Sequence, residues 1–139
     1  KKIGFLISQV FYLHEQHLNK QFSKFGLTAS QTFTLIYLFK SHDKGISVNQ
    51  KDIEKELDIS NPTVTGILNR LEVKGLITRV PCRHDARAKN IEVTEKALEL
   101  DKQLRIVFQQ SDEKLVESLS KEEIDNLQSY LIKILRSNS

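Results

Sequence analysis

The chain is poor in the residues that stabilise small secreted domains and strand-rich folds. Its 139 residues include one cysteine, Cys82, two prolines and five glycines, with no methionine and no tryptophan. A lone cysteine cannot form an internal disulfide framework or a multi-cysteine zinc site, which suits a reducing compartment, and we expect a cytoplasmic protein. Because glycine and proline are scarce while Leu, Ile, Glu and Lys recur periodically, the composition favours helices.

Long apolar runs are missing as well. No stretch of about 18 apolar residues occurs, so we expect no membrane-spanning segment. The opening KKIGFLISQVFYL has two lysines ahead of an apolar stretch, as a signal peptide does. However, Gln9, His14 and Glu15 interrupt the apolar pattern and no small-residue cleavage site follows. We therefore interpret this segment as an amphipathic helix.

The net charge of +3 is unevenly distributed. Residues 61–90 contain six basic and two acidic side chains, whereas residues 111–139 contain four basic and six acidic ones. A basic middle beside an acidic end is the pattern expected if the middle of the chain faces a polyanion. Solvated surface charge is the alternative explanation.

Apolar residues spaced three and four apart predict six helices. The expected helices cover residues 3–22, 28–40, 47–57, 61–74, 94–118 and 120–135. Three of the helix starts fit capping boxes, in which side chains three residues apart satisfy free backbone N–H groups. The expected boxes are Thr28 with Gln31, Ser47 with Gln50, and Ser120 with Glu123.

Two β-prone runs, LITRV and KNIEVT, flank the basic segment PCRHDARA and predict a hairpin with a charged tip. A shorter extended segment, ISV, precedes the third helix, so the expected order is α-α-β-α-α-β-β-α-α. Two short helices joined by a tight turn and followed by a hairpin make a winged helix-turn-helix. The predicted fold class is therefore mostly α (α+β). We expect a winged helix-turn-helix DNA-binding lobe over 28–93 and a helical dimerisation region over 1–27 and 94–139.

The fourth helix begins with an unusually small and polar turn, SNPTVTG, which offers little to a hydrophobic core. Such a start lets the backbone approach DNA closely, and its free N–H groups favour phosphate. Threonine can contact bases or phosphate, asparagine can pair with adenine, and arginine can contact guanine or phosphate. A glycine inside a helix costs about 1 kcal/mol, so close approach to the duplex would explain it. The expected DNA-binding residues of this helix are Asn61, Pro62, Thr63, Thr65, Gly66, Asn69 and Arg70.

The hairpin tip adds four expected DNA-binding residues, Arg83, Asp85, Arg87 and Lys89. We expect Arg87 to enter the minor groove and the Asp85 carboxylate to hold its guanidinium in one orientation. Arg83 and Lys89 are expected to contact phosphates. Each of these residues could instead be an ordinary solvated surface residue.

Several segments together resemble the MarR family of bacterial transcription regulators. They are LTASQ, ISVNQKDIEKELDIS, PTVTGILNRLEVKGLITR, DARAKNIEVTEKA and LSKEE. The resemblance implies a homodimer in which the first, fifth and sixth helices interlock, so that two recognition helices meet a pseudo-palindromic site on double-stranded DNA. It also implies control by a small phenolic or lipophilic effector bound between the dimer helices and the DNA-binding lobe. We expect a repressor that this effector releases, and no cofactor is expected.

Candidate sensor residues have simpler alternative explanations. An effector pocket could be lined by Phe11, His14, Phe33 and Tyr37, although core packing explains these residues equally well. His14 and His17 lie one helical turn apart, yet no second His or Cys cluster completes a metal site, so no metal is expected. Cys82 beside Arg83 could act as a thiol switch, but an inert thiol is the simpler interpretation.

Two rival functions differ from that of a specific regulator. A sequence-nonspecific architectural DNA-binding protein would share the basic surface but show little preference between sites. A metal- or thiol-responsive regulator is the more remote alternative. An enzyme is not expected, because the sequence has no nucleophile elbow, phosphate-binding loop or HExxH motif.

Overall fold

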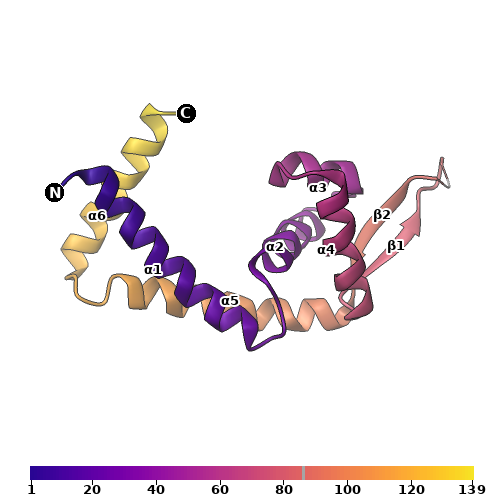
Figure 1. Ribbon diagram of the computed structural model, residues 1–139, viewed down its shortest axis with the longest axis horizontal. Coiled ribbons are helices and arrows are strands. Elements are labelled where there is room, and N and C mark those ends of the chain that lie inside the picture. Colours follow the sequence, from indigo (N-terminus) through magenta and orange to yellow (C-terminus); the bar gives the residue numbers. More distant parts are fainter. Residues whose placement is uncertain (86) are drawn as a thin grey trace.

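A computed structural model describes residues 1–85 and 87–139. Within these residues the fold consists of six helices and one two-stranded antiparallel sheet. The elements are α1 (Ile3–Ser23), α2 (Ala29–Asp43), α3 (Gln50–Leu57), α4 (Asn61–Val73), β1 (Ile77–Pro81), β2 (Lys89–Val93), α5 (Glu95–Leu115) and α6 (Lys121–Ser137). Figure 1 shows α1, α6 and both termini at one end of the molecule and the hairpin at the other, with α5 running along the bottom of the view between them.

The capping boxes at Thr28 and Ser120 are confirmed. In each, the hydroxyl accepts a hydrogen bond from the N–H three residues on, and the side chain at that position bonds back to the capping residue. The box expected at Ser47 is wrong. Asn49 caps α3 instead, accepting from the N–H of Asp52 at 2.9 Å. Asparagine is as good an N-cap as serine, so local preference alone does not choose between them.

The strand expected at ISV does not form. Val48 accepts a hydrogen bond from the Ile91 N–H at 2.7 Å, and Asn49 forms an isolated bridge with Asn90. The pairing with β2 does not extend beyond this bridge, and α3 begins at the next residue. The bridge also helps to place the start of the helix, since Asn49 itself is extended, with φ −109° and ψ 177°.

The core lies between α2, α3, α4, the sheet and the first part of α5. The predicted buried stripe of α4 is confirmed, with Val64, Leu68 and Leu71 fully buried and Ile67 nearly so. Each such side chain contributes about 1.5–3 kcal/mol on burial. Phe22 from the end of α1 is also fully buried and makes edge contacts with the Phe33 and Phe108 rings, at centroid distances of 6.1 and 5.7 Å. One face of α4 therefore packs against the core, and its other face points away from the core.

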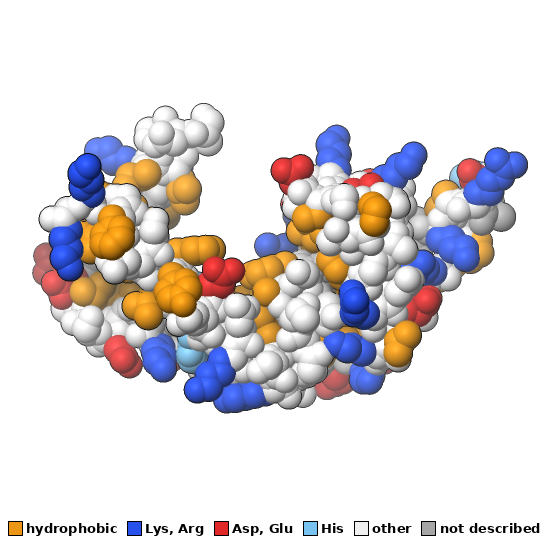
Figure 2. Space-filling model, viewed as in Figure 1, with side chains coloured by type: hydrophobic (Ala, Val, Ile, Leu, Met, Phe, Trp, Pro, Cys, Tyr) orange, Lys and Arg blue, Asp and Glu red, His pale blue; other side chains and the backbone are white. Residues whose placement is uncertain are grey.

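Helix α6 has no buried residue. Its apolar stripe is exposed, and the first half of α1 and part of α5 likewise present apolar side chains to solvent. The most exposed of these are Ile3, Phe5, Phe11, Tyr12, Leu13, Ile106, Tyr130 and Leu135. Figure 2 shows hydrophobic side chains gathered over this end of the molecule. A soluble monomer rarely leaves so extended an apolar surface uncovered.

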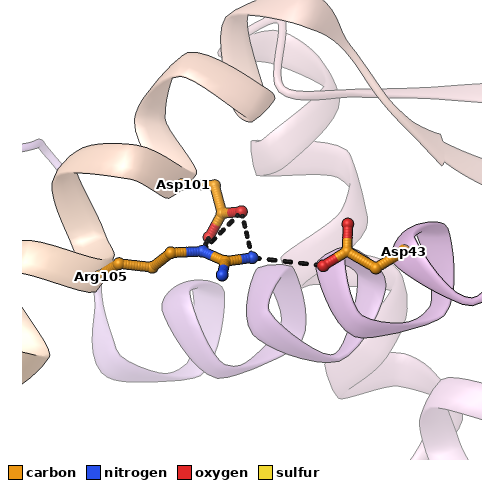
Figure 3. Close-up of polar contacts among 3 residues, drawn as sticks. All are labelled: Asp43, Asp101 and Arg105. Atoms are coloured by element: carbon orange, nitrogen blue, oxygen red, sulfur yellow. Dashed lines mark hydrogen bonds and ion pairs between the residues drawn. The ribbon is translucent and has the colours of Figure 1, made fainter.

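A charged cluster joins the end of α2 to α5 (Figure 3). The Arg105 guanidinium donates to both carboxylate oxygens of Asp101, one helical turn earlier, and Nη2 also reaches Asp43 Oδ2 at 3.2 Å. The hydrogen bond to Asp101, followed by the charge of that carboxylate, raises the pKa of Arg105 above its ordinary value. The Arg105 and Asp43 side chains are largely exposed, so the ion pair between them contributes little to stability.

None of the helices within the described residues is both long enough and apolar enough to cross a membrane.

Candidate nucleic-acid interface

Helix α4 is presented by a tight turn. Asp58, at φ 52°, ends α3 in the left-handed conformation, and the Ser60 hydroxyl then accepts from the Thr63 N–H to begin α4. Pro62 falls in the first turn, where the missing N–H has no intrahelical partner to lose. Among the expected DNA-binding residues of α4, five are exposed and two half-buried. The exposed ones are Asn61, Pro62, Thr63, Asn69 and Arg70, and the half-buried ones are Thr65 and Gly66.

Polar side chains of α3 hold the start of α4 in place. Gln50 Nε2 donates to Thr65 Oγ1 at 2.8 Å and to the Asn61 carbonyl at 3.4 Å. Asn61 Nδ2 in turn donates to Glu54 Oε2 at 2.9 Å. Side chains fixed in this way lose less rotamer entropy when they meet a ligand. The polar surface at the start of α4 is therefore partly ordered before anything binds to it.

Gly66 has an explanation within its own helix. A Cβ at this position would lie 3.3 Å from Arg70 Nη1, so the guanidinium of Arg70 lies back over the glycine. The sequence suggested that Gly66 allows close approach of a duplex. In the structure it is the Arg70 side chain that occupies this space.

Arg79 of β1 connects the wing to α4, a role not expected from the sequence, where it is only one of the six basic residues of segment 61–90. Its Nη2 donates to Asn69 Oδ1 at 2.7 Å, and its Nε lies 3.9 Å from Glu72 Oε2. A signal was present in the alternation of β1, because Arg79 lies two residues after the buried Ile77 and so points to the same face of the hairpin. The partner on α4 could not be inferred from that pattern.

The wing is a regular hairpin whose pairing runs from Ile77 with Val93 to Pro81 with Lys89. At its tip, Asp85 Oδ1 accepts from the backbone N–H of Arg87 at 3.0 Å. The role expected for Asp85 is therefore corrected, because its carboxylate bonds the backbone of Arg87 and not its guanidinium. An aspartate that bonds the backbone two residues on stabilises a turn. Asp85 thus shapes the loop that carries Arg83 and Arg87, both of which are exposed.

A cavity of about 400 Å³ separates the start of α3 from the wing. Four of its lining residues are basic, namely Lys51, Arg79, Arg87 and Lys89. Figure 2 shows Lys and Arg side chains over this lobe and along the hairpin. No carboxylate lines the cavity among the described residues, so its electrostatic potential favours an anion such as a phosphate.

The four residues expected to line an effector pocket lie against different neighbours. His14 lines a cavity of about 440 Å³ between α1 and α5, and Phe33 packs on Phe22. Tyr37 is half-buried, and burial, followed by the charges of nearby carboxylates, raises its pKa. Phe11 remains 62% exposed. The single pocket inferred from sequence is not assembled by these residues within this chain.

Two other candidate sensor groups have ordinary surroundings. Cys82 is half-buried and lies 3.3 Å from Asn90 Oδ1. His17 lies near His14 and several lysines, and burial, followed by the charge of Lys114, lowers its pKa. In the part of the chain that the structure describes, no three His, Cys, Asp or Glu side chains come together as metal ligands would.

Comparison with known proteins gives consistent matches. Residues 25–88 match the model of the MarR family. MepR, a transcription regulator of the Staphylococcus aureus multidrug efflux pump MepA, is 29% identical over the whole of both chains, with a TM-score of 0.87. The S. aureus MepR–DNA complex is 31% identical, covering 99% of this chain and 98% of that one, with a TM-score of 0.77. The reduced form of MarR from E. coli is 25% identical over 97% of each chain, with a TM-score of 0.84.

Proposed function

This chain belongs to the MarR family of transcription regulators, and we propose that it acts as a homodimer that binds a pseudo-palindromic site on double-stranded DNA with sequence specificity. In this proposal residues 28–93 form the DNA-binding lobe, and residues 1–27 and 94–139 form the dimerisation region. The protein would act in the cytoplasm, where a bacterial regulator meets its DNA.

The observation that carries the proposal is the outward face of α4. Its polar residues are exposed or half-buried, and Gln50 and Glu54 of α3 hold two of them in place. The basic cavity beside the wing lies next to this face. In a winged helix-turn-helix the second helix of the motif enters the major groove while the wing follows the backbone. We assign base contacts to the exposed side chains of α4 and phosphate or minor-groove contacts to the wing.

The uncovered apolar surface of α1 and α6 supports a second copy of this chain as the partner. A 17-residue amphipathic helix with no buried residue gains little by folding against its own chain, whereas a twofold partner would bury its apolar stripe. A twofold dimer would place its two α4 helices about 34 Å apart, one turn of DNA.

We propose further that the protein represses its target genes and that a small phenolic or lipophilic ligand releases it. MepR is described as a regulator of a multidrug efflux pump, and a similar role here would require such a release. A ligand achieves this only if it binds more tightly to the conformation that does not fit DNA.

Selection from a random duplex pool tests the proposed function. The best duplex recovered should contain an inverted repeat, and the protein should bind it at least about 1,000-fold more tightly than a scrambled duplex at the same salt concentration. The scrambled duplex has the same length and composition, so phosphate contacts alone cannot distinguish the two. Equal affinity would instead indicate a sequence-nonspecific DNA-binding protein.

A further inference from the structure

The side chain of Asn69 has a fixed orientation in this structure. Its Oδ1 accepts a hydrogen bond of 2.7 Å from Arg79 Nη2. A guanidinium has only donors, so it can hold the carboxamide oxygen but not the amide nitrogen. Turning the carboxamide over would place Nδ2 against Arg79 and lose a charge-assisted hydrogen bond. The amide nitrogen of Asn69, with two N–H donors, is therefore directed away from Arg79.

Arg79 is itself held in position. It belongs to β1, where it pairs with Ile91 of β2, and its side chain is only 23% exposed. Glu72, one turn after Asn69 on α4, lies 3.9 Å from Arg79 Nε. The carboxylate and the packing of the strand together limit the positions that the guanidinium can take. The Arg79 guanidinium therefore offers Asn69 a hydrogen-bond donor at a nearly fixed position.

This geometry limits the bases that Asn69 should recognise. Bidentate pairing with adenine requires Oδ1 to accept from adenine N6 while Nδ2 donates to N7. With Arg79 bonded to one lone pair of Oδ1, the group directed away from Arg79 is the Nδ2 donor. In the major groove guanine presents the acceptors O6 and N7, thymine presents O4 and adenine presents N7, whereas cytosine presents only the N4 amino donor. The fixed Nδ2 donor therefore suits every base except cytosine.

Resting on the proposed function, we propose that Arg79 is a specificity-determining positioning residue. It makes Asn69 a hydrogen-bond donor toward the major groove, so that a base with a major-groove acceptor is accepted at this position and cytosine is rejected. Arg79 acts through Asn69 and need not touch the base itself.

Two substitutions with graded expected effects test the proposal. Arg79→Met keeps an unbranched aliphatic stem but releases the Asn69 carboxamide, which can then turn its Oδ1 toward the N4 amino group of cytosine. A good base contact corresponds to about fivefold or greater discrimination, so the discrimination against cytosine at that position should fall by about that factor. Asn69→Asp beside Arg79 presents only acceptors, and the preferred base should change to cytosine.

Lys89→Met is the matched control. Lys89 lies on the facing strand and lines the same basic cavity, so this substitution also removes one positive charge from the wing. Its loss should weaken binding to all sequences alike and leave the order of base preference unchanged. Arg79→Lys is a second control, because a lysine retains a donor toward Oδ1 and should keep the original preference even if Arg79→Met unfolds.

The readout is base preference, measured by sequencing duplexes selected from a random pool by each variant. The proposal predicts that the natural chain and Arg79→Lys reject cytosine, that Arg79→Met accepts cytosine about fivefold more readily, and that Asn69→Asp prefers cytosine. It is overturned if the natural chain already accepts cytosine at the position that responds to Asn69, or if Arg79→Met rejects cytosine as strongly as the natural chain does. If the natural chain selects no sequence at all, the proposed function fails, and this inference fails with it.

Discussion

Replacing Leu131 by alanine should loosen the dimer without unfolding the subunit. Leu131 lies on the apolar stripe of α6 and is 43% exposed in the single chain. Full burial of a leucine side chain is worth about 1.5–3 kcal/mol, so covering the remaining exposed part contributes about 1 kcal/mol. A twofold dimer contains the residue twice, so the loss is about 2 kcal/mol and the dissociation constant should rise about 30-fold.

Sedimentation of labelled protein over a dilution series measures this change directly. Lys133→Ala is the matched control, because Lys133 lies two residues away, on the opposite face of the same helix, and is exposed. It should leave the dissociation constant within about twofold of the original. Far-ultraviolet circular dichroism should show unchanged helix content in both variants at concentrations where they remain dimeric. If Leu131→Ala dissociates no more readily than Lys133→Ala, α6 does not form the dimer interface and the reasoning is wrong.

Three further substitutions have distinct expected outcomes. Arg87→Ala should weaken DNA binding while the dimer persists. If Arg87 contacts a phosphate or enters the minor groove, the substitution should also lower the slope of log K against log salt concentration by about one. An unchanged affinity in fluorescence anisotropy would mean that Arg87 is not part of the interface. Gly66→Ala should raise the free energy of unfolding by up to about 1 kcal/mol in urea denaturation, because the atom nearest the new Cβ is the flexible end of Arg70; a lower stability would mean that the guanidinium cannot move aside. His17→Gln should reduce the pH dependence of stability. The pKa of His17 is lowered in the folded state, so the unfolded state binds more protons and stability is lost as the pH falls below about 6.5. The two proteins would contradict this if their urea denaturation curves were identical from about pH 5 to pH 8.

Local sequence patterns predicted most of the fold because the deciding interactions are themselves local. The capping boxes at Thr28 and Ser120 involve residues three apart, and the buried stripe of α4 follows helical periodicity. The start of α3 was mispredicted because Ser47 and Asn49 are both good N-caps. The choice is made by the contact of Val48 with Ile91, more than forty residues away in sequence, which no local pattern contains.

The same difference between local and long-range interactions applies to the candidate interface. Exposure of Asn61, Thr63 and Arg70 follows from the position of the apolar stripe. In contrast, the hydrogen bond between Arg79 and Asn69 depends on how β1 crosses α4, and no sequence pattern contains the distance between these elements. The orientation of a side chain that joins two elements requires their relative placement, so the base preference inferred from Asn69 alone was incomplete.

The spacing between half-sites tests the central claim most directly. Once a bound inverted repeat has been selected, duplexes with altered distances between the half-site centres can be compared at fixed salt. Two recognition helices related by a twofold axis should bind most tightly when the centres are about 10 base pairs apart, or one turn of DNA. Adding about five base pairs should reduce the affinity sharply, because the second half-site then faces the opposite side of the duplex. Affinity that does not depend on spacing would contradict the claim that paired α4 helices recognise the DNA.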